Sequence, residues 1–164
     1  MHLSNFTKLP MDRVYDVSDL LHAAKVEVSF LYNYGFIGNS YAKIKGLLEH
    51  LSKVFQHIPR VLCHGDYGDV NVLANNNGQR VIIDWEDVFY GVEGYDFLYW
   101  LTFFDHRKYY CTKLFESLKG GHKTNMGILI MILLIKEAMS VYNGEFKRNQ
   151  LTAEERIEEL LDYL

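Results

Sequence analysis

The stretch His64-Gly-Asp-Tyr-Gly-Asp-Val-Asn71 decides how this chain of 164 residues folds, because it interrupts a pattern that is otherwise helical. The short apolar run Arg60–Cys63 precedes it, and two β-prone runs follow, Asn71–Ala74 and Arg80–Asp84. Between these runs stands Asn75-Asn-Asn-Gly78, and Asn and Gly tolerate the positive φ of a tight turn. The sequence therefore predicts a β-hairpin with a polar loop in front of it.

Helical patterns lie on both sides of this hairpin. Apolar residues recur there at helical spacing, with capping residues where the runs begin. The fold class is therefore predicted as α+β and mostly α, with a helical bundle around the small hairpin and one domain over residues 1–164. The expected helices run from the cap at Asp16 to Gly35, from Asn39-Ser40 to Pro59, over Tyr95–Phe104, over Thr124–Tyr142, and onward from the capping box Thr152-x-x-Glu155.

Composition argues against several classes of protein. With 17 basic and 21 acidic residues the net charge is -4, whereas a nucleic-acid binder usually has a basic face. Cys63 and Cys111 form neither a disulfide framework nor a zinc pattern, so we expect buried, reduced thiols in a cytoplasmic protein. Met1–Pro10 lacks the apolar stretch of a signal peptide, and Met126–Ile135 is too short to span a membrane. We therefore expect neither a nucleic-acid nor a membrane partner.

Three polar residues mark the two ends of the hairpin region. Asn71 follows Asp66 by five positions, and Asp84 follows Asn71 by thirteen. An antiparallel hairpin brings its open ends together, so Asn71 and Asp84 should lie close in space. In kinases, a catalytic-loop Asp is the base, an Asn five positions later binds metal, and a second Asp binds metal from the other side. The spacing therefore favours phosphoryl transfer with Mg²⁺ held by oxygen ligands.

These motifs resemble a known family. His64-Gly65-Asp66, Asn71 and Ile83-Asp84-Trp85 are similar to the catalytic and metal-binding motifs of the aminoglycoside phosphotransferase and choline kinase family. Gly91 and Tyr95-Asp96 resemble a later segment of that family, although Val92 and Glu93 stand where Asp and Pro are usual.

The resemblance implies a kinase-like C-terminal catalytic lobe, with ATP or GTP as the phosphoryl donor and Mg²⁺ as the metal. Asp66 would be the catalytic base, and Asn71 and Asp84 would be the metal ligands. The residues implied to support them are His64, which braces the loop rather than carrying a proton, and Gly65, Trp85 and Asp96.

Such enzymes hold the nucleotide under an N-terminal β-lobe, and this chain shows no pattern for one. Only 63 residues precede His64, and their periodicity is helical. We therefore expect the N-terminal lobe to be absent. A second polypeptide or a second copy of the chain would then supply the missing half of the site, attracted by an exposed apolar surface.

The composition of one region of the chain suggests what kind of acceptor is bound. Residues 81–106 contain six acidic and nine aromatic residues but neither Lys nor Arg. This bias suits a small cationic acceptor, bound through ion pairs and cation–π contacts. The candidate contacts are Glu86, Asp87, Tyr95 and Trp100. The alternative is that most of these aromatics belong to the core and that the acids bind metal or cap helices.

Two functions follow from the whole pattern. One is a phosphotransferase that moves the γ-phosphate of ATP to a hydroxyl of a small molecule. The other is a non-catalytic remnant or binding module that retains only the fold of the lobe. The three intact residues at the hairpin favour the first, and the missing lobe favours the second.

Overall fold

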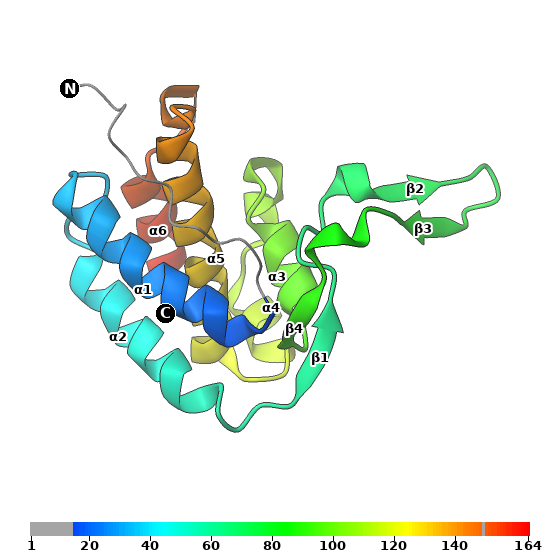
Figure 1. The fold of residues 1–164 in the computed structure, drawn as a ribbon, viewed down its shortest axis with the longest axis horizontal. Coiled ribbons are helices and arrows are strands. Elements are labelled where there is room, and N and C mark those ends of the chain that lie inside the picture. Colours follow the sequence, from blue (N-terminus) through cyan, green and yellow to red (C-terminus); the bar gives the residue numbers. More distant parts are fainter. Residues whose placement is uncertain (1–14, 149) are drawn as a thin grey trace.

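The computed structural model describes residues 15–148 and 150–164, which form mostly α-helices with two short antiparallel strand pairs (Figure 1). This confirms the predicted fold class, while the expectation about Met1–Pro10 lies outside the described residues. The helices are α1 (Val17–Asn33), α2 (Tyr41–Val54), α3 (Tyr95–Leu101), α4 (Thr112–Ser117), α5 (His122–Tyr142) and α6 (Ala153–Leu161). The strands are β1 (Arg60–Cys63), β2 (Val72–Ala74), β3 (Arg80–Ile82) and β4 (Phe89–Val92).

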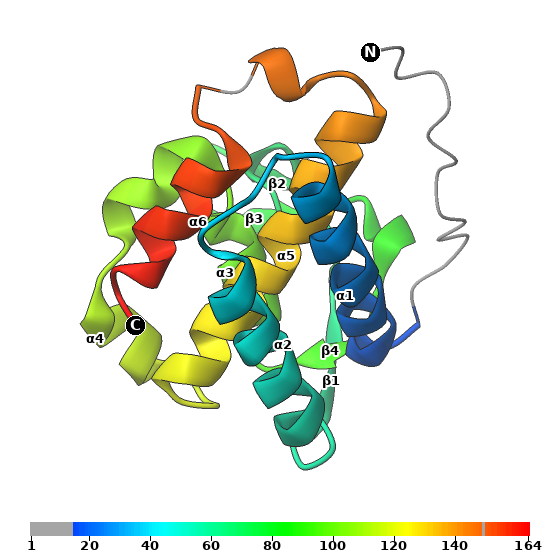
Figure 2. The same cartoon turned by 90° about the vertical axis from the view of Figure 1, so that its left-hand side faces the viewer.

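Helix α5 forms the centre of the core, and α1, α2, α3, α4 and α6 all pack against it (Figure 2). Every residue from Thr124 to Leu134 is buried. By length and composition α5 is also the one helix of the described part that could cross a membrane. However, 78% of its most apolar window is buried inside the protein, which is typical of a core helix.

Local signals set the ends of α1 and α6. Asp16 accepts the backbone N–H of Ser18 at 2.8 Å, and Asp19 accepts the backbone N–H of Asp16 at 3.0 Å. Thr152 and Glu155 form the predicted capping box at the start of α6. These reciprocal bonds satisfy N–H groups that a helix start leaves without a partner. Both predicted starts are therefore confirmed.

The predicted hairpin is β2 paired with β3, in a register that places Leu73 opposite Val81. It projects away from the helical body (Figure 1). A second pair was not predicted: β1 pairs with β4, which places Leu62 opposite Tyr90. This pair closes the base of the segment that carries the hairpin, so the loop after β1 is held from both sides.

Several boundaries differ from the sequence prediction. The helix expected over Tyr95–Phe104 ends at Leu101, where the Thr102 hydroxyl donates to the Tyr99 carbonyl at 2.6 Å and tightens the last turn. The second helix ends at Val54, before Pro59, and α4 was not predicted. The expectation of two buried thiols is wrong for Cys111, which is exposed because it lies just before α4, whereas Cys63 is buried beneath β4.

Candidate functional site

The polar loop runs from the end of β1 to the start of β2, and backbone geometry fixes its beginning. Gly65 has φ +89°, a conformation that residues with a Cβ rarely adopt. A Cβ at this position would also overlap the backbone carbonyl oxygen of Asp87. The predicted supporting residue Gly65 is therefore the residue type that lets the loop turn directly against the segment after β3.

Asp96, in the first turn of α3, holds the same part of the loop. Its carboxylate accepts the backbone N–H of His64 at 3.1 and 3.0 Å and that of Gly65 at 3.2 Å. Hydrogen bonds to an ionised carboxylate are about twice as strong as bonds between neutral groups. Asp96 thereby joins the loop to the helical body, so it is not available to a substrate.

His64 joins the loop to the far strand of the hairpin. Its side chain is 1% exposed, and Nε2 lies 2.8 Å from the carbonyl oxygen of Ile83. A carbonyl only accepts, so Nε2 carries the hydrogen in this arrangement. The edge of the ring meets Trp85 at 4.9 Å between centroids, and Trp85 in turn donates to the carbonyl of Ile82 at 3.0 Å. The two predicted supporting side chains therefore pack together at the end of β3.

Asp66 and Asn71 are in direct contact. The amide nitrogen of Asn71 donates to the backbone oxygen of Asp66 at 2.8 Å and to carboxylate oxygen Oδ2 at 3.2 Å. Both contacts use the nitrogen, so the amide oxygen of Asn71 points away from Asp66 and receives no hydrogen bond from the described residues. Asn71 is 6% exposed, which holds this orientation in place.

The hairpin brings the backbone just before Asp84 to Asn71: the N–H of Ile83 donates to the Asn71 carbonyl at 3.0 Å. Asp84 has φ 64° and ψ 61°, the one positive φ outside glycine in the described residues. Such left-handed conformations cost energy and cluster at functional sites. The Asp84 side chain is exposed, and no donor of the described part bonds to it.

These donors fit a magnesium ion better than a closed metal cage. An amide oxygen and a carboxylate are hard ligands, and Mg²⁺ usually takes one or two protein carboxylates and keeps several waters. Within residues 15–148 and 150–164, no three His, Cys, Asp or Glu side chains gather as a metal group, which does not suit an all-protein site. The convergence of Asp66, Asn71 and Asp84 on one cleft stays a prediction.

The four candidate substrate contacts lie in different environments in the structure. Glu86 and Asp87 are exposed just after Asp84, whereas Tyr95 is 3% exposed and packs edge-on against Phe89 in the core. Trp100 donates from its indole nitrogen to Asp69 of the polar loop at 2.7 Å. The ring of Tyr95 therefore belongs to the core.

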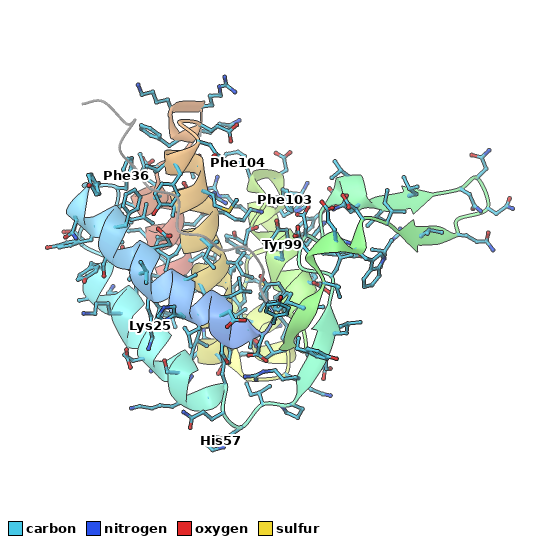
Figure 3. The ribbon with its side chains drawn as sticks, viewed as in Figure 1. Lys25, Phe36, His57, Tyr99, Phe103 and Phe104 are labelled. Carbon is cyan, nitrogen blue, oxygen red and sulfur yellow. The ribbon has the colours of Figure 1, made fainter. Side chains whose placement is uncertain are left out.

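Two residues near Asp66 were missed by the sequence analysis. The hydroxyl of Tyr99 donates to Asp66 Oδ1 at 2.6 Å, and the ammonium of Lys136 lies 4.2 Å from the centre of the Tyr99 ring. The ring of Tyr99 lies 6.0 Å from that of Phe103 between centres, and both side chains are labelled in Figure 3. Tyr99 follows Asp96 by one helical turn, and Lys136 is the charge that directly follows the apolar run Met126–Ile135, which are the signals that could have revealed them.

His106 is a further residue that sequence reasoning did not single out. It stacks on Trp100 at 3.7 Å between ring centres. Its Nδ1 faces the carbonyl of Trp100 at 2.7 Å, and its Nε2 faces Asp69 at 3.3 Å. Trp100 and His106 therefore hold the middle of the polar loop from the side of α3.

An Asp–Asn loop, a second Asp after a hairpin and a helical body form the arrangement expected of a kinase-like phosphotransferase. Residues 37–109 match the model of the phosphotransferase enzyme family, a match that includes the loop, the hairpin and α3. The match supports membership of the aminoglycoside phosphotransferase and choline kinase family, and its partial coverage is consistent with a single lobe. No curated protein and no solved structure gives a significant match to the chain.

Proposed function

We propose that this chain is the catalytic lobe of an ATP- or GTP-dependent phosphotransferase that moves the γ-phosphate to a hydroxyl of a small molecule. The observation that carries the proposal is the orientation of Asn71. The Asn71 nitrogen donates to Asp66, so its oxygen is left for a metal ion. The two carboxylate oxygens of Asp66 each accept one hydrogen bond, from Asn71 and from Tyr99, and their remaining lone pairs are left for the acceptor hydroxyl. Kinases divide the same two tasks between an Asp and the Asn five positions later.

In this proposal Asp66 orients the acceptor hydroxyl and takes its proton as the hydroxyl oxygen bonds to the γ-phosphorus. The bond from that phosphorus to the bridging oxygen breaks, and the nucleoside diphosphate leaves with the electron pair. Asn71 and Asp84 hold Mg²⁺, which neutralises charge on the phosphates when bound. Asp96, Gly65 and His64 keep the loop rigid. Phosphoryl transfer depends mainly on positioning and charge stabilisation, so rigid support of the loop serves the reaction directly.

A cationic acceptor is the finer part of the proposal. Of the six acids in residues 81–106, Asp96 is committed to the loop and Glu93 pairs with Lys119 at 2.7 Å. Asp84 is assigned to the metal, which leaves Glu86, Asp87 and Asp105, all of them exposed, to attract a positively charged group.

The nucleotide side of the site is proposed to come from elsewhere. A second polypeptide or a second copy of the chain would supply the lobe that covers the phosphates, and a cytoplasmic location remains our expectation. The exposed positions of Leu73 and Val81 on the projecting hairpin favour such an association. A non-catalytic binding module is the second candidate, favoured by the helices that occupy the place before β1.

The test is transfer of labelled phosphate from ATP to choline, aminoglycosides and sugars, alongside MgATP binding. We expect weak binding, slow transfer by the chain alone, and loss of both in Asp84→Asn. Asp66→Asn should bind MgATP normally yet abolish transfer, and Asp162→Asn, at the exposed end of α6, is the matched control. Transfer that survives Asp66→Asn would exclude the catalytic proposal, and binding without transfer in every protein would favour the binding module.

A further inference from the structure

Lys136 occupies an unusual position for a lysine. It lies in α5, the core helix, and its ammonium donates to the Thr102 hydroxyl at 2.8 Å. The rings of Tyr99 and Phe103 enclose it, with centres 4.2 and 4.0 Å from the nitrogen. The ammonium therefore contacts one hydroxyl and two aromatic faces, and it forms no ion pair with a carboxylate of the described residues.

The other partly buried cations of the described chain are all paired. Five lysines and arginines there are at least partly buried, and four of them form an ion pair with a carboxylate, leaving Lys136 as the exception. The adjacent carboxylate of Glu137 is engaged by Arg156. The four pairs are Lys25–Glu49, Arg60–Asp16, Arg107–Glu159 and Arg156–Glu137.

A partly buried cation without a counter-charge is costly, and proteins usually pair or neutralise such a group. Burial lowers the pKa of Lys136 to about 8, and the charge of Arg156 adds to the decrease, while Asp66 and Glu137 oppose it. A lysine held in this way near a catalytic group is a candidate functional residue. A bound anion would supply the missing counter-charge.

The position of Lys136 suggests which anion that is. Tyr99 contacts both groups: its ring centre lies 4.2 Å from the Lys136 ammonium, and its hydroxyl donates to the carboxylate of Asp66 at 2.6 Å. Burial and the hydrogen bond to Asp66 raise the pKa of Tyr99, so its hydroxyl stays protonated and donates. The unpaired charge is thus next to the group that we propose as the base.

We propose that Lys136 binds the oxygens of the phosphoryl group beside Asp66, an inference that rests on the proposed function. It would supply, from α5, a positive charge that the phosphates need. Asn71 and Asp84 would act on the phosphates by holding a metal ion, whereas Lys136 would contact phosphate oxygen directly. Its one hydrogen bond, to Thr102, is the contact that it exchanges for phosphate.

A purely structural role is the competing explanation, since a cation between two aromatic rings stabilises a core. The two explanations differ in how Lys136 responds to an anion. A structural lysine is indifferent to phosphate, whereas a phosphate-binding lysine becomes harder to deprotonate when phosphate is present. This response is measurable without catalytic turnover.

The test follows the lysine side chains by NMR in full chain labelled with ¹³C at Cε, with inorganic pyrophosphate as the probe. The Lys136 signal is identified by its loss in Lys136→Met. We expect its titration midpoint to rise in pyrophosphate while that of Lys25 stays constant. Lys136→Met should weaken pyrophosphate binding at least about tenfold, since it removes a charged hydrogen bond. Lys136→Arg should retain most of the binding, and Lys25→Met, on α1 away from Tyr99, is the control (Figure 3).

An unchanged Lys136 midpoint in saturating pyrophosphate would overturn the inference, and so would the absence of pyrophosphate binding. The proposed function has its own test. If Asp66→Asn abolishes transfer while Lys136→Met keeps both transfer and pyrophosphate binding, only the role of Lys136 fails. If Asp66→Asn retains transfer, the proposed function fails whatever Lys136 does.

Discussion

The carboxylate of Asp96 accepts the backbone N–H of His64 through both of its oxygens, at 3.1 and 3.0 Å. The two residues are 32 positions apart, so this contact ties the polar loop to α3 across the intervening hairpin. It orients the backbone two residues before Asp66. The geometry of the proposed base therefore depends on a carboxylate that does not itself face the acceptor.

Asp96→Ala should lower the free energy of unfolding by about 2–4 kcal/mol, because two partly buried N–H groups lose their acceptor. Asp96→Asn keeps one acceptor oxygen and should cost less. Urea unfolding measures both, with the exposed Asp105→Asn as the control. Equal stability of Asp96→Ala and Asp105→Asn would mean that the loop does not depend on Asp96.

Gly65→Ala should destabilise the protein by at least about 2 kcal/mol, because a Cβ disfavours the left-handed backbone and overlaps the Asp87 carbonyl. Gly46→Ala is the matched control: Gly46 lies within α2, and nothing is near the position of its Cβ. That change should stabilise by about 0.5–1 kcal/mol. Thermal unfolding of both variants is the measurement, and opposite signs are the expected result.

Local signals explain the parts of the fold that the sequence predicted. The cap at Asp16, the turn at Asn75 and the capping box at Thr152 each depend on residues within a few positions of one another. Strand β4 was missed because its identity depends on pairing with β1, nearly thirty residues earlier. Phe89-Tyr-Gly-Val92 alone is too short to distinguish a strand from a loop.

Some residues of the site could likewise be predicted from the sequence, and others could not. Asp66, Asn71 and Asp84 lie in one motif whose spacing is visible in the sequence. The hairpin bonds the N–H of Ile83, one residue before Asp84, to the carbonyl of Asn71. Tyr99 and Lys136 were not visible, because Tyr99 joins α3 to the loop and Lys136 joins α5 to Thr102, each across more than thirty residues. Only the packing of these helices reveals that an isolated charge lies near the loop.

The projecting hairpin should promote self-association. Leu73 and Val81 face each other across it and are 53% and 59% exposed. Exposed apolar surface of this kind marks an interaction site. A Leu73→Lys, Val81→Lys double variant should shift the protein toward monomer in sedimentation velocity, while Met139→Lys, exposed on α5, should not. A wild-type chain that stays monomeric at high concentration would contradict the prediction.

Lys136→Met should remove a dependence of stability on pH that lies between about pH 8 and 10. The pKa of Lys136 is about 8 in the folded protein and 10.5 when unperturbed, so the unfolded chain binds more protons in this range. Stability then rises with pH across the range, and below pH 8 the folded protein carries the full cost of the buried charge. The shift corresponds to at most about 3 kcal/mol. Arg156, Asp66 and Glu137 supply the other charges at this site, and they remain in the variant.

Urea unfolding at pH 7, 8, 9 and 10 should therefore show the wild type gaining stability relative to Lys136→Met. Lys25→Met should follow the wild type throughout. Parallel curves for wild type and Lys136→Met would show that folding does not alter the proton affinity of Lys136.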